Sequence, residues 1–235
     1  MDLFAPLQRA LAEQNYKHPT PIQSKTIPPA IDGLDILGCA LTGSGKTAAF
    51  ALPILDYLGH EQPPVKANRP TALVLAPTRE LAIQIAESFR TYGKHMRFRQ
   101  TLVYGGVGQG DQIKALRRGV DVLIATPGRL LDLMDHGHVD LSDIEIFVLD
   151  EADRMLDMGF IPDVRRITRA LPGDRQTLLF SATQPREIRE LASRLLHEPV
   201  EVAVDPPSST REPISQSVYF VEGPRKLGML LKLLE

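Results

Sequence analysis

Glycines, a lysine and a threonine stand together in the first quarter of the chain at the spacing of a phosphate-binding loop. The segment Ala40-Leu41-Thr42-Gly43-Ser44-Gly45-Lys46-Thr47 follows a short apolar run and precedes a run with helical spacing. Backbone N–H groups converge on a phosphate where a strand turns through glycines into a helix. Lys46 can then reach the terminal phosphates, and the Thr47 hydroxyl can take one Mg²⁺ coordination position. The segment predicts binding of a nucleoside triphosphate, although Ala40 stands where the strict pattern has glycine.

A second chemical signal is the pair of adjacent carboxylates Asp150 and Glu151, which ends the mostly apolar run 144–149. Such a pair often only complements the dipole of a following helix. In a chain with a phosphate-binding loop, Asp150 can also hold Mg²⁺ through water, and Glu151 can orient or deprotonate the attacking water. We therefore expect Lys46, Asp150 and Glu151 to be catalytic, with Thr47 and Asp150 as metal ligands.

Two arginines occupy places that helix formation does not explain. Each arginine belongs to a segment that ends an apolar run and opens a helical one. The two segments are Pro77-Thr78-Arg79 and Thr126-Pro127-Gly128-Arg129, and their threonines are expected N-caps. A cation in the first turn of a helix opposes the helix dipole by about 0.3–1 kcal/mol. Arg79 and Arg129 therefore suggest a bound anion such as a nucleic-acid phosphate, and Gly105-Gly106 would let a backbone approach closely.

Two polar segments leave alternatives open. Gln23 follows Thr20 and Pro21 at the spacing of a capping box, which the residues alone favour, while its carboxamide also matches N6 and N7 of adenine. Ser181 and Thr183 follow an apolar run, and capping of the next helix is their simpler role. The alternative is a hydrogen bond to an acidic neighbour such as Asp153, which would link nucleotide state to the rest of the domain.

The elements that position these residues follow from the order of apolar runs. Near-continuous runs of strand length alternate with amphipathic helical runs, which is typical of a parallel sheet covered on both faces. Functional loops then gather at the carboxyl ends of the strands. The expected strands are 36–40, 71–76, 100–104, 120–125, 145–149, 177–180 and 200–204. The expected helices are 3–14, one from residue 21, 47–58, 80–92, 110–118, 129–135, 164–170 and 186–196.

Composition sets the remaining limits. The chain is 43% hydrophobic with a net charge of −2, so nucleic acid would have to be bound by local residues rather than by a basic surface. A single cysteine, Cys39, fits a reducing compartment, and no apolar run approaches the roughly 18 residues of a membrane span. We expect a cytoplasmic monomer.

The chain divides at a polar, proline-rich stretch. Residues 1–204 form the expected main domain, 205–213 a linker, and 214–235 the start of a second, truncated domain with a strand over 215–221 and a helix over 226–234.

In this order the motifs closely resemble the N-terminal RecA-like domain of the DEAD-box ATP-dependent RNA helicases. The sequence 154–160, after the acidic pair, is especially similar to the bacterial RhlE-like branch. Asp150-Glu151-Ala152-Asp153 spells the family's name. Residues 19–23 resemble its Q motif, within an N-terminal region 1–33, and the loop 40–47 resembles its motif I, which normally begins with alanine. The remaining matches are 77–82 (motif Ia), 105–106 (GG), 126–129 (motif Ib) and 181–183 (motif III).

The resemblance implies a three-layer α/β fold and a set of roles. ATP and Mg²⁺ would bind at the loop 40–47, with Gln23 reading adenine and Tyr16 stacking on it, which reverses the preference for a mere cap. RNA backbone would contact Pro77, Thr78, Arg79, Gly105, Gly106, Thr126, Pro127, Gly128 and Arg129, independent of sequence. Asp153, Ser181 and Thr183 would couple this domain to the second RecA-like domain, which carries arginine fingers.

The chain also departs from the family's usual pattern. Leu41 replaces a glutamine, Asn15 a glycine, and Gln184 a methionine or phenylalanine. Two rival functions remain: a P-loop ATPase that acts on DNA or as a protein switch, and a binding module without productive turnover.

Overall fold

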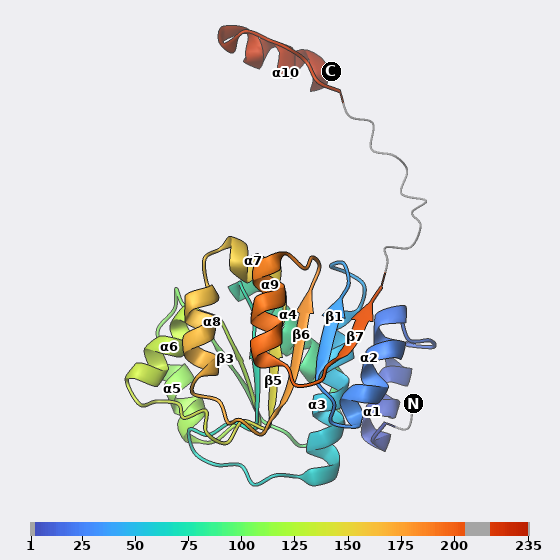
Figure 1. Cartoon of the computed structure of the whole chain (residues 1–235), viewed down its shortest axis with the longest axis vertical. Helices are drawn as coiled ribbons and strands as arrows, with labels where there is room; N and C mark the ends of the chain where they lie inside the picture. Colours follow the sequence, from blue (N-terminus) through green and yellow to red (C-terminus); the bar gives the residue numbers. More distant parts are fainter. Residues whose placement is uncertain (1–2, 205–216, 235) are drawn as a thin grey trace. The chain divides into compact units, whose positions relative to one another are not determined.

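The computed structural model describes residues 3–204 and 217–234, and the chain divides into two units, Met1–Val204 and Asp205–Glu235. The first unit is built on a seven-stranded sheet (Figure 1). Its strands are β1 (Ile36–Cys39), β2 (Ala72–Leu75), β3 (Gln100–Val103), β4 (Val122–Ala125), β5 (Ile146–Leu149), β6 (Gln176–Ser181) and β7 (Val200–Ala203).

The strands lie in the order β3-β4-β2-β5-β6-β1-β7, and every pairing between neighbours is parallel. Helices cover both faces, so the expected three-layer α/β fold with a parallel central sheet is confirmed (Figure 1). One face carries α1 (Ala5–Glu13), α2 (Pro21–Ile31), α3 (Lys46–Glu61) and α4 (Arg79–Tyr92). The other carries α5 (Gly110–Arg117), α6 (Pro127–Asp135), α7 (Ala152–Asp157), α8 (Ile161–Thr168) and α9 (Arg186–Leu195).

The two helical layers are held by alternate residues of the same strands. In β2, Ala72 and Val74 pack into the core beneath α1–α4, while Leu73 and Leu75 pack into the core beneath α5–α9. All four residues are fully buried. A strand with both faces buried reads as a continuous apolar run, which is why the strands could be recognised without alternation.

Each strand and helix expected within 1–204 is present within a few residues of its expected bounds. The addition is α7, a six-residue helix directly after the acidic pair.

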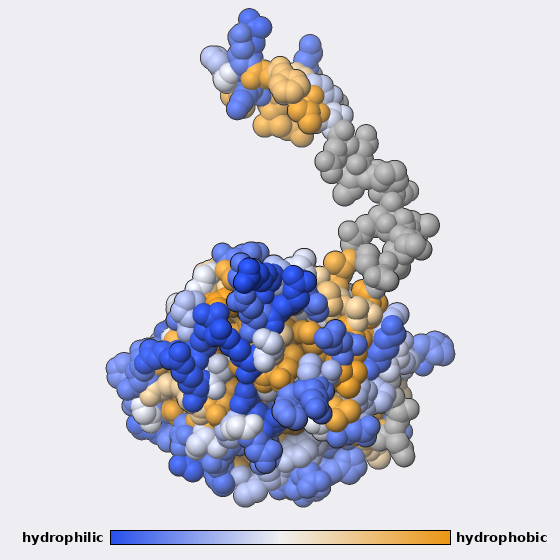
Figure 2. Space-filling model, in the orientation of Figure 1, coloured by the Kyte–Doolittle hydropathy of each residue, from blue (hydrophilic) through white to orange (hydrophobic). Residues whose placement is uncertain are grey.

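The second unit is described over 217–234 and contains η1 (Gly223–Arg225) and α10 (Lys226–Leu234). The expected helix is confirmed. Its leucines are exposed (Leu227, Leu230, Leu231, Leu233 and Leu234), and Figure 2 shows the apolar surface on one side of α10. The strand expected over 215–221 is wrong in its described part, because residues 217–221 have no described strand in this unit with which to pair. The expected linker 205–213 lies outside the described residues.

Within the two described ranges, no helix combines the length and hydropathy needed to span a bilayer.

Candidate functional site

The strand order sorts the chemically interesting residues into two neighbouring groups. Parallel strands bring their carboxyl ends to one edge of the sheet, where α/β proteins bind ligands. Strands β5, β6 and β1 are adjacent and lead into Asp150, Ser181 and the loop 40–47. Strands β3, β4 and β2 are also adjacent and lead toward Gly105-Gly106, Thr126 and Pro77. One half of the edge thus carries the predicted nucleotide residues, and the other half carries the predicted RNA residues.

The loop 40–47 connects β1 to α3 in a conformation that depends on glycine. Gly43 and Gly45 have φ values of 83° and 96°, in the left-handed region, and Gly45 is the N-cap of α3. Lys46, the first residue of α3, is buried and its Nζ donates a hydrogen bond to Ala40 O at 2.8 Å. The Ser44 hydroxyl oxygen is buried without a hydrogen-bond partner among the described residues. The loop therefore holds an ammonium group and an unused hydroxyl beside a helix N-terminus.

Asp150 directly follows β5 and is only 2% exposed. Burial raises the pKa of Asp150 to about 6, against the opposing effect of Lys46 and with the help of Glu151. A cation beside this carboxylate would hold it in its charged form. Thr47, half-buried at the start of α3, supplies a hydroxyl from the loop after β1, which is separated from β5 by β6 alone. Mg²⁺ bound with nucleotide phosphates needs only one or two such protein ligands, so this sparse set fits the ion. The described residues contain no cluster of three or more metal-binding side chains.

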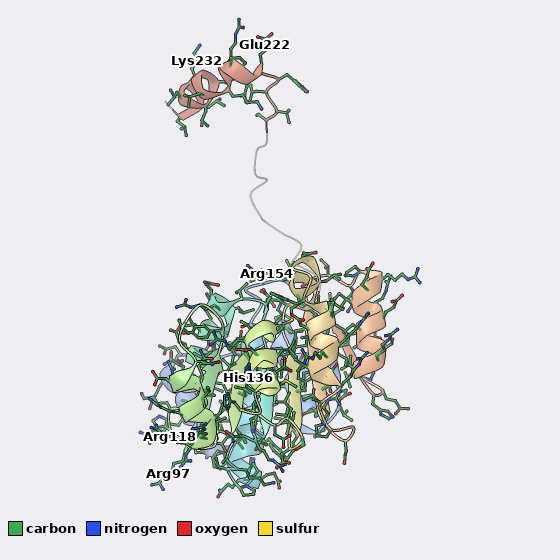
Figure 3. All side chains as sticks on the ribbon, turned by 90° about the vertical axis from the view of Figure 1, so that its left-hand side faces the viewer. Arg97, Arg118, His136, Arg154, Glu222 and Lys232 are labelled. Atoms are coloured by element: carbon green, nitrogen blue, oxygen red, sulfur yellow. The ribbon has the colours of Figure 1, made fainter. Side chains whose placement is uncertain are left out.

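Glu151 adopts a left-handed backbone conformation, with φ 51°, as the N-cap of α7. Its side chain is nearly buried and accepts hydrogen bonds from Thr42 Oγ1 at 3.5 Å and from Arg154 Nη1 at 3.2 Å. Arg154 lies at the carboxyl edge, at the opposite end of this unit from Arg97 and Arg118 (Figure 3). Sequence reasoning missed Arg154, although its spacing of three residues from Glu151 was a usable signal.

Gln23 makes two hydrogen bonds through its carboxamide group. Its Oε1 accepts a hydrogen bond from the Thr20 backbone N–H at 2.9 Å, which confirms the cap. Its Nε2 donates to Gly45 O at 3.2 Å, so the side chain also braces the phosphate loop. A Cβ at position 45 would overlap Gln23 Nε2, so a larger residue would displace this side chain in addition to straining the left-handed backbone. Gln23 and Tyr16 line a pocket of about 320 Å³ beside α1.

In the second group, Arg79 lies between an aromatic ring and a glycine turn. Its guanidinium is 4.9 Å from the centroid of the Tyr104 ring, and Gly106 adopts φ 83° nearby. Thr78 caps α4 by accepting a hydrogen bond from the Leu81 N–H at 3.2 Å, as expected. Arg79 itself is exposed, which leaves it free for a phosphate.

Arg129 has structural contacts that the sequence did not indicate. Its guanidinium donates to Val107 O at 3.1 Å and to Gln112 Oε1 at 3.4 Å, and it lies 3.5 Å from an Asp132 carboxylate oxygen. Thr126 is the N-cap of α6 by position, although its side chain makes no capping hydrogen bond. Arg129 thus anchors the loop after β3. Gln112 was missed, and its sequence context carries no signal for this contact.

Ser181 and Thr183 follow the alternative interpretation rather than the favoured one. Helix α9 begins after Pro185, so neither hydroxyl caps it. Thr183 donates through both its N–H and its Oγ1 to Asp153 Oδ2, each at 2.9 Å, and Ser181 Oγ accepts from the Asp153 N–H at 3.2 Å. Burial raises the pKa of Asp153, but these hydrogen bonds outweigh it and the net pKa is lowered. The end of β6 is thereby joined to α7.

Residues 20–191, which carry both groups of side chains, match the DEAD/DEAH box helicase family. The chain belongs to that family. It is 48% identical over 236 residues to the ATP-dependent RNA helicase DeaD of Escherichia coli K12, covering 100% of this chain and 37% of that protein. It is 44% identical over 239 residues to the DeaD protein of Mycobacterium tuberculosis, covering 99% of this chain and 41% of that protein.

Among solved structures, a hypothetical ATP-dependent RNA helicase from Sulfolobus tokodaii matches with a TM-score of 0.78 and 40% identity. The match covers 86% of this chain and 57% of that one. The chain thus spans well under two thirds of these DEAD/DEAH family relatives.

Assignment to the RhlE-like branch stays a prediction. The Asn15 departure has a physical account, because its φ of 57° is left-handed and asparagine tolerates that region better than most residues.

Proposed function

We propose that this chain is the N-terminal RecA-like half of a cytoplasmic, monomeric ATP-dependent RNA helicase that couples ATP binding and hydrolysis to local separation of RNA strands. The supporting observation is the division of the sheet's carboxyl edge into a phosphate-loop half, with Lys46 and Asp150, and a half with exposed Arg79 and the Gly105-Gly106 turn. The names of the relatives, ATP-dependent RNA helicases, favour this pairing of ligands.

The residues of the nucleotide half have distinct tasks in this proposal. Gln23 and Tyr16 hold adenine, the backbone of 40–47 cradles the phosphates, and Lys46 pairs with the terminal ones. Mg²⁺, held by Thr47 and Asp150 partly through water, would neutralise phosphate charge when bound. Glu151 orients the attacking water and takes its proton.

RNA would lie along the other half of the edge. Arg79 pairs with a backbone phosphate, while Gly106, Thr126 and Gly128 let the sugar–phosphate chain approach closely. Arg129 acts mainly by fixing the loop after β3, with RNA contact as a secondary role. These contacts read no base edges, so binding is independent of sequence and falls with added salt.

Residues 214–235 are, in this proposal, the start of a second RecA-like domain, joined by the linker 205–213. The second domain would supply arginine fingers, each worth about 10³–10⁵ in rate. Asp153, Ser181 and Thr183 would transmit its position to Glu151. The chain as given therefore binds adenine nucleotide but hydrolyses it very slowly.

The decisive experiment measures ATP hydrolysis, with and without RNA, by a chain extended through the second domain. RNA-stimulated hydrolysis supports the proposal. Equal stimulation by DNA of the same length would favour a DNA-directed ATPase, and nucleotide binding without turnover would favour a binding module.

A further inference from the structure

We propose that the C-terminal end of α4 and the residues directly after it hold Tyr16 in place as a wall of the nucleotide pocket. Tyr92, Lys94 and His95 would then be positioning residues for base recognition. The inference rests on the proposed function, because it requires adenine to occupy the pocket lined by Tyr16 and Gln23.

The first contact joins the exposed side chain of Tyr16 to the buried side chain of Tyr92. Tyr16 lies on the connection between α1 and α2 and is 50% exposed, whereas Tyr92, the last residue of α4, is 6% exposed. Their hydroxyl oxygens are 3.4 Å apart, and their rings meet edge to face with centroids 6.1 Å apart at 67°. A half-exposed phenol would otherwise sample several rotamers. The buried ring therefore selects one orientation for the exposed one.

The second contact fixes the backbone that carries Tyr16. Glu13, the last residue of α1, pairs with Lys94 Nζ at 2.8 Å and with His95 Nε2 at 2.9 Å. Arg9 approaches the same carboxylate at 3.4 Å. The Tyr16 N–H then closes the turn by donating to Leu11 O at 3.1 Å. Single exposed ion pairs contribute little, but Glu13 bonds two side chains that follow α4, and it lies three residues before Tyr16. The segment 13–16 is therefore held at Glu13 by Lys94 and His95 and at Tyr16 by Tyr92.

These contacts of Tyr16 should affect the binding of the adenine base and not that of the phosphates. The pocket wall formed by Tyr16 is separate from the loop 40–47, which is braced by Gln23 through Gly45 O. A ring already held in its bound orientation loses less conformational entropy when a base stacks on it. Removing the contacts of Tyr92 or Glu13 should therefore lower the affinity for ligands that contain adenine and leave the affinity for ligands that consist of phosphate alone unchanged.

The test compares binding of ADP and of inorganic pyrophosphate, both with Mg²⁺, by calorimetry. We expect Tyr92→Phe, which removes only the hydroxyl, to lower ADP affinity about threefold to tenfold and to leave pyrophosphate affinity unchanged. Tyr57→Phe is the matched control, because Tyr57 lies on α3 away from the pocket and its phenol hydroxyl donates to Glu145, directly before β5. The control should change neither affinity.

A double-mutant cycle identifies the route of the effect. In a Tyr16→Ala background, Tyr92→Phe should cause no further loss of ADP affinity, because Tyr92 acts only through Tyr16. Glu13→Gln, on the surface, should weaken ADP in the same selective way and provides the test if Tyr92→Phe does not fold. Equal losses for ADP and pyrophosphate, additive losses in the cycle, or no loss in either variant would overturn the inference. Failure of the parent chain to bind ADP would instead overturn the proposed function, and the inference with it.

Discussion

Glu151 combines three properties that a merely structural residue rarely shares. Its backbone is left-handed, with φ 51°, its side chain is nearly buried, and both carboxylate oxygens have polar partners in Thr42 and Arg154. A left-handed non-glycine residue costs about 1–3 kcal/mol and persists only when its surroundings fix it. Here the surroundings aim a carboxylate beside Asp150, which suits a base for the attacking water.

The role of Glu151 is testable with a near-isosteric change. In a chain extended through the second domain, Glu151→Gln should lower RNA-stimulated ATP hydrolysis by about 10²–10⁴-fold, because the amide cannot accept the proton of water. Nucleotide affinity should stay within a few-fold of the parent. Glu145→Gln, an exposed carboxylate at the amino end of β5, should leave hydrolysis unchanged. Full activity in Glu151→Gln would remove the assigned role.

A second prediction uses a substitution at Gln23 to distinguish helix capping from base recognition. Gln23→Ala should reduce the preference for ATP over GTP by about tenfold, because the carboxamide's donor and acceptor are lost. The cap on α2 is lost as well, at about 0.5–2 kcal/mol of stability. Gln8→Ala is the control, because Gln8 lines the same pocket but donates to Leu3 O. Competition binding with a labelled ADP measures the preference, and an unchanged ATP-to-GTP ratio in Gln23→Ala would leave only the cap.

At this scale, contiguous motifs were predictable and distant partners were not. The caps at Gln23 and Thr78 involve residues three apart, so their spacing contains the whole geometry. Arg129 bonds to residues 17 and 22 positions away, and Tyr16 meets Tyr92 across 76 positions. No local pattern encodes such contacts, because they depend on how the chain folds back on itself.

Among the elements, the strands were recognisable because burial on both faces makes their sequences continuously apolar. Their order was not predictable, since β1 pairs with β6 and joins Ile36 to Leu178. Helix α7 was missed because six residues span less than two turns and show no full helical period. The strand expected over 215–221 failed for the opposite reason, because an alternating pattern forms a strand only beside another strand.

The junction between β6 and α7 yields a prediction with a defined pH dependence. Thr183→Val removes one of the hydrogen bonds that lower the pKa of Asp153, so the carboxylate form is stabilised less. A lowered pKa contributes stability above the ordinary value of 3.8, and this contribution is lost as pH falls. Thr183→Val should therefore destabilise the domain by about 0.5–1 kcal/mol at pH 7, a value discounted for exposure.

The same change should cost less at pH 3, because this pH lies below the ordinary pKa of 3.8 and part of the contribution of the lowered pKa is already lost there. Urea unfolding at the two pH values measures the difference. Thr168→Val removes an exposed hydroxyl that donates to Arg165 O, and its effect should not vary with pH. An effect of Thr183→Val that is equal at pH 7 and pH 3 would show that Asp153 is not its partner.

For the molecule as a whole, the near-neutral charge means that, in the proposed function, RNA is bound by local residues and not by a generally basic surface. Net charge −2 gives no general attraction for a polyanion, so the exposed Arg79 carries more weight than it would in a basic protein. The second unit contributes a nine-residue helix with exposed leucines, and an isolated helix of that length is marginal in water. In the proposed function, the remainder of a second domain covers those leucines.

This arrangement predicts that the chain as given and an extended chain differ in turnover but not in nucleotide binding. The given chain contains Gln23, the loop 40–47 and the acidic pair, so it should bind ADP with Mg²⁺ about as tightly as the extended chain does. Arginine fingers stabilise charge that develops only during phosphoryl transfer, so their absence should lower hydrolysis by about 10³–10⁵-fold. Steady-state phosphate release with and without RNA measures turnover, and calorimetry measures binding. Lys46→Ala in the extended chain is the control for hydrolysis by contaminants. RNA-stimulated turnover by the given chain at the rate of the extended one would show that the site is already complete on the first unit.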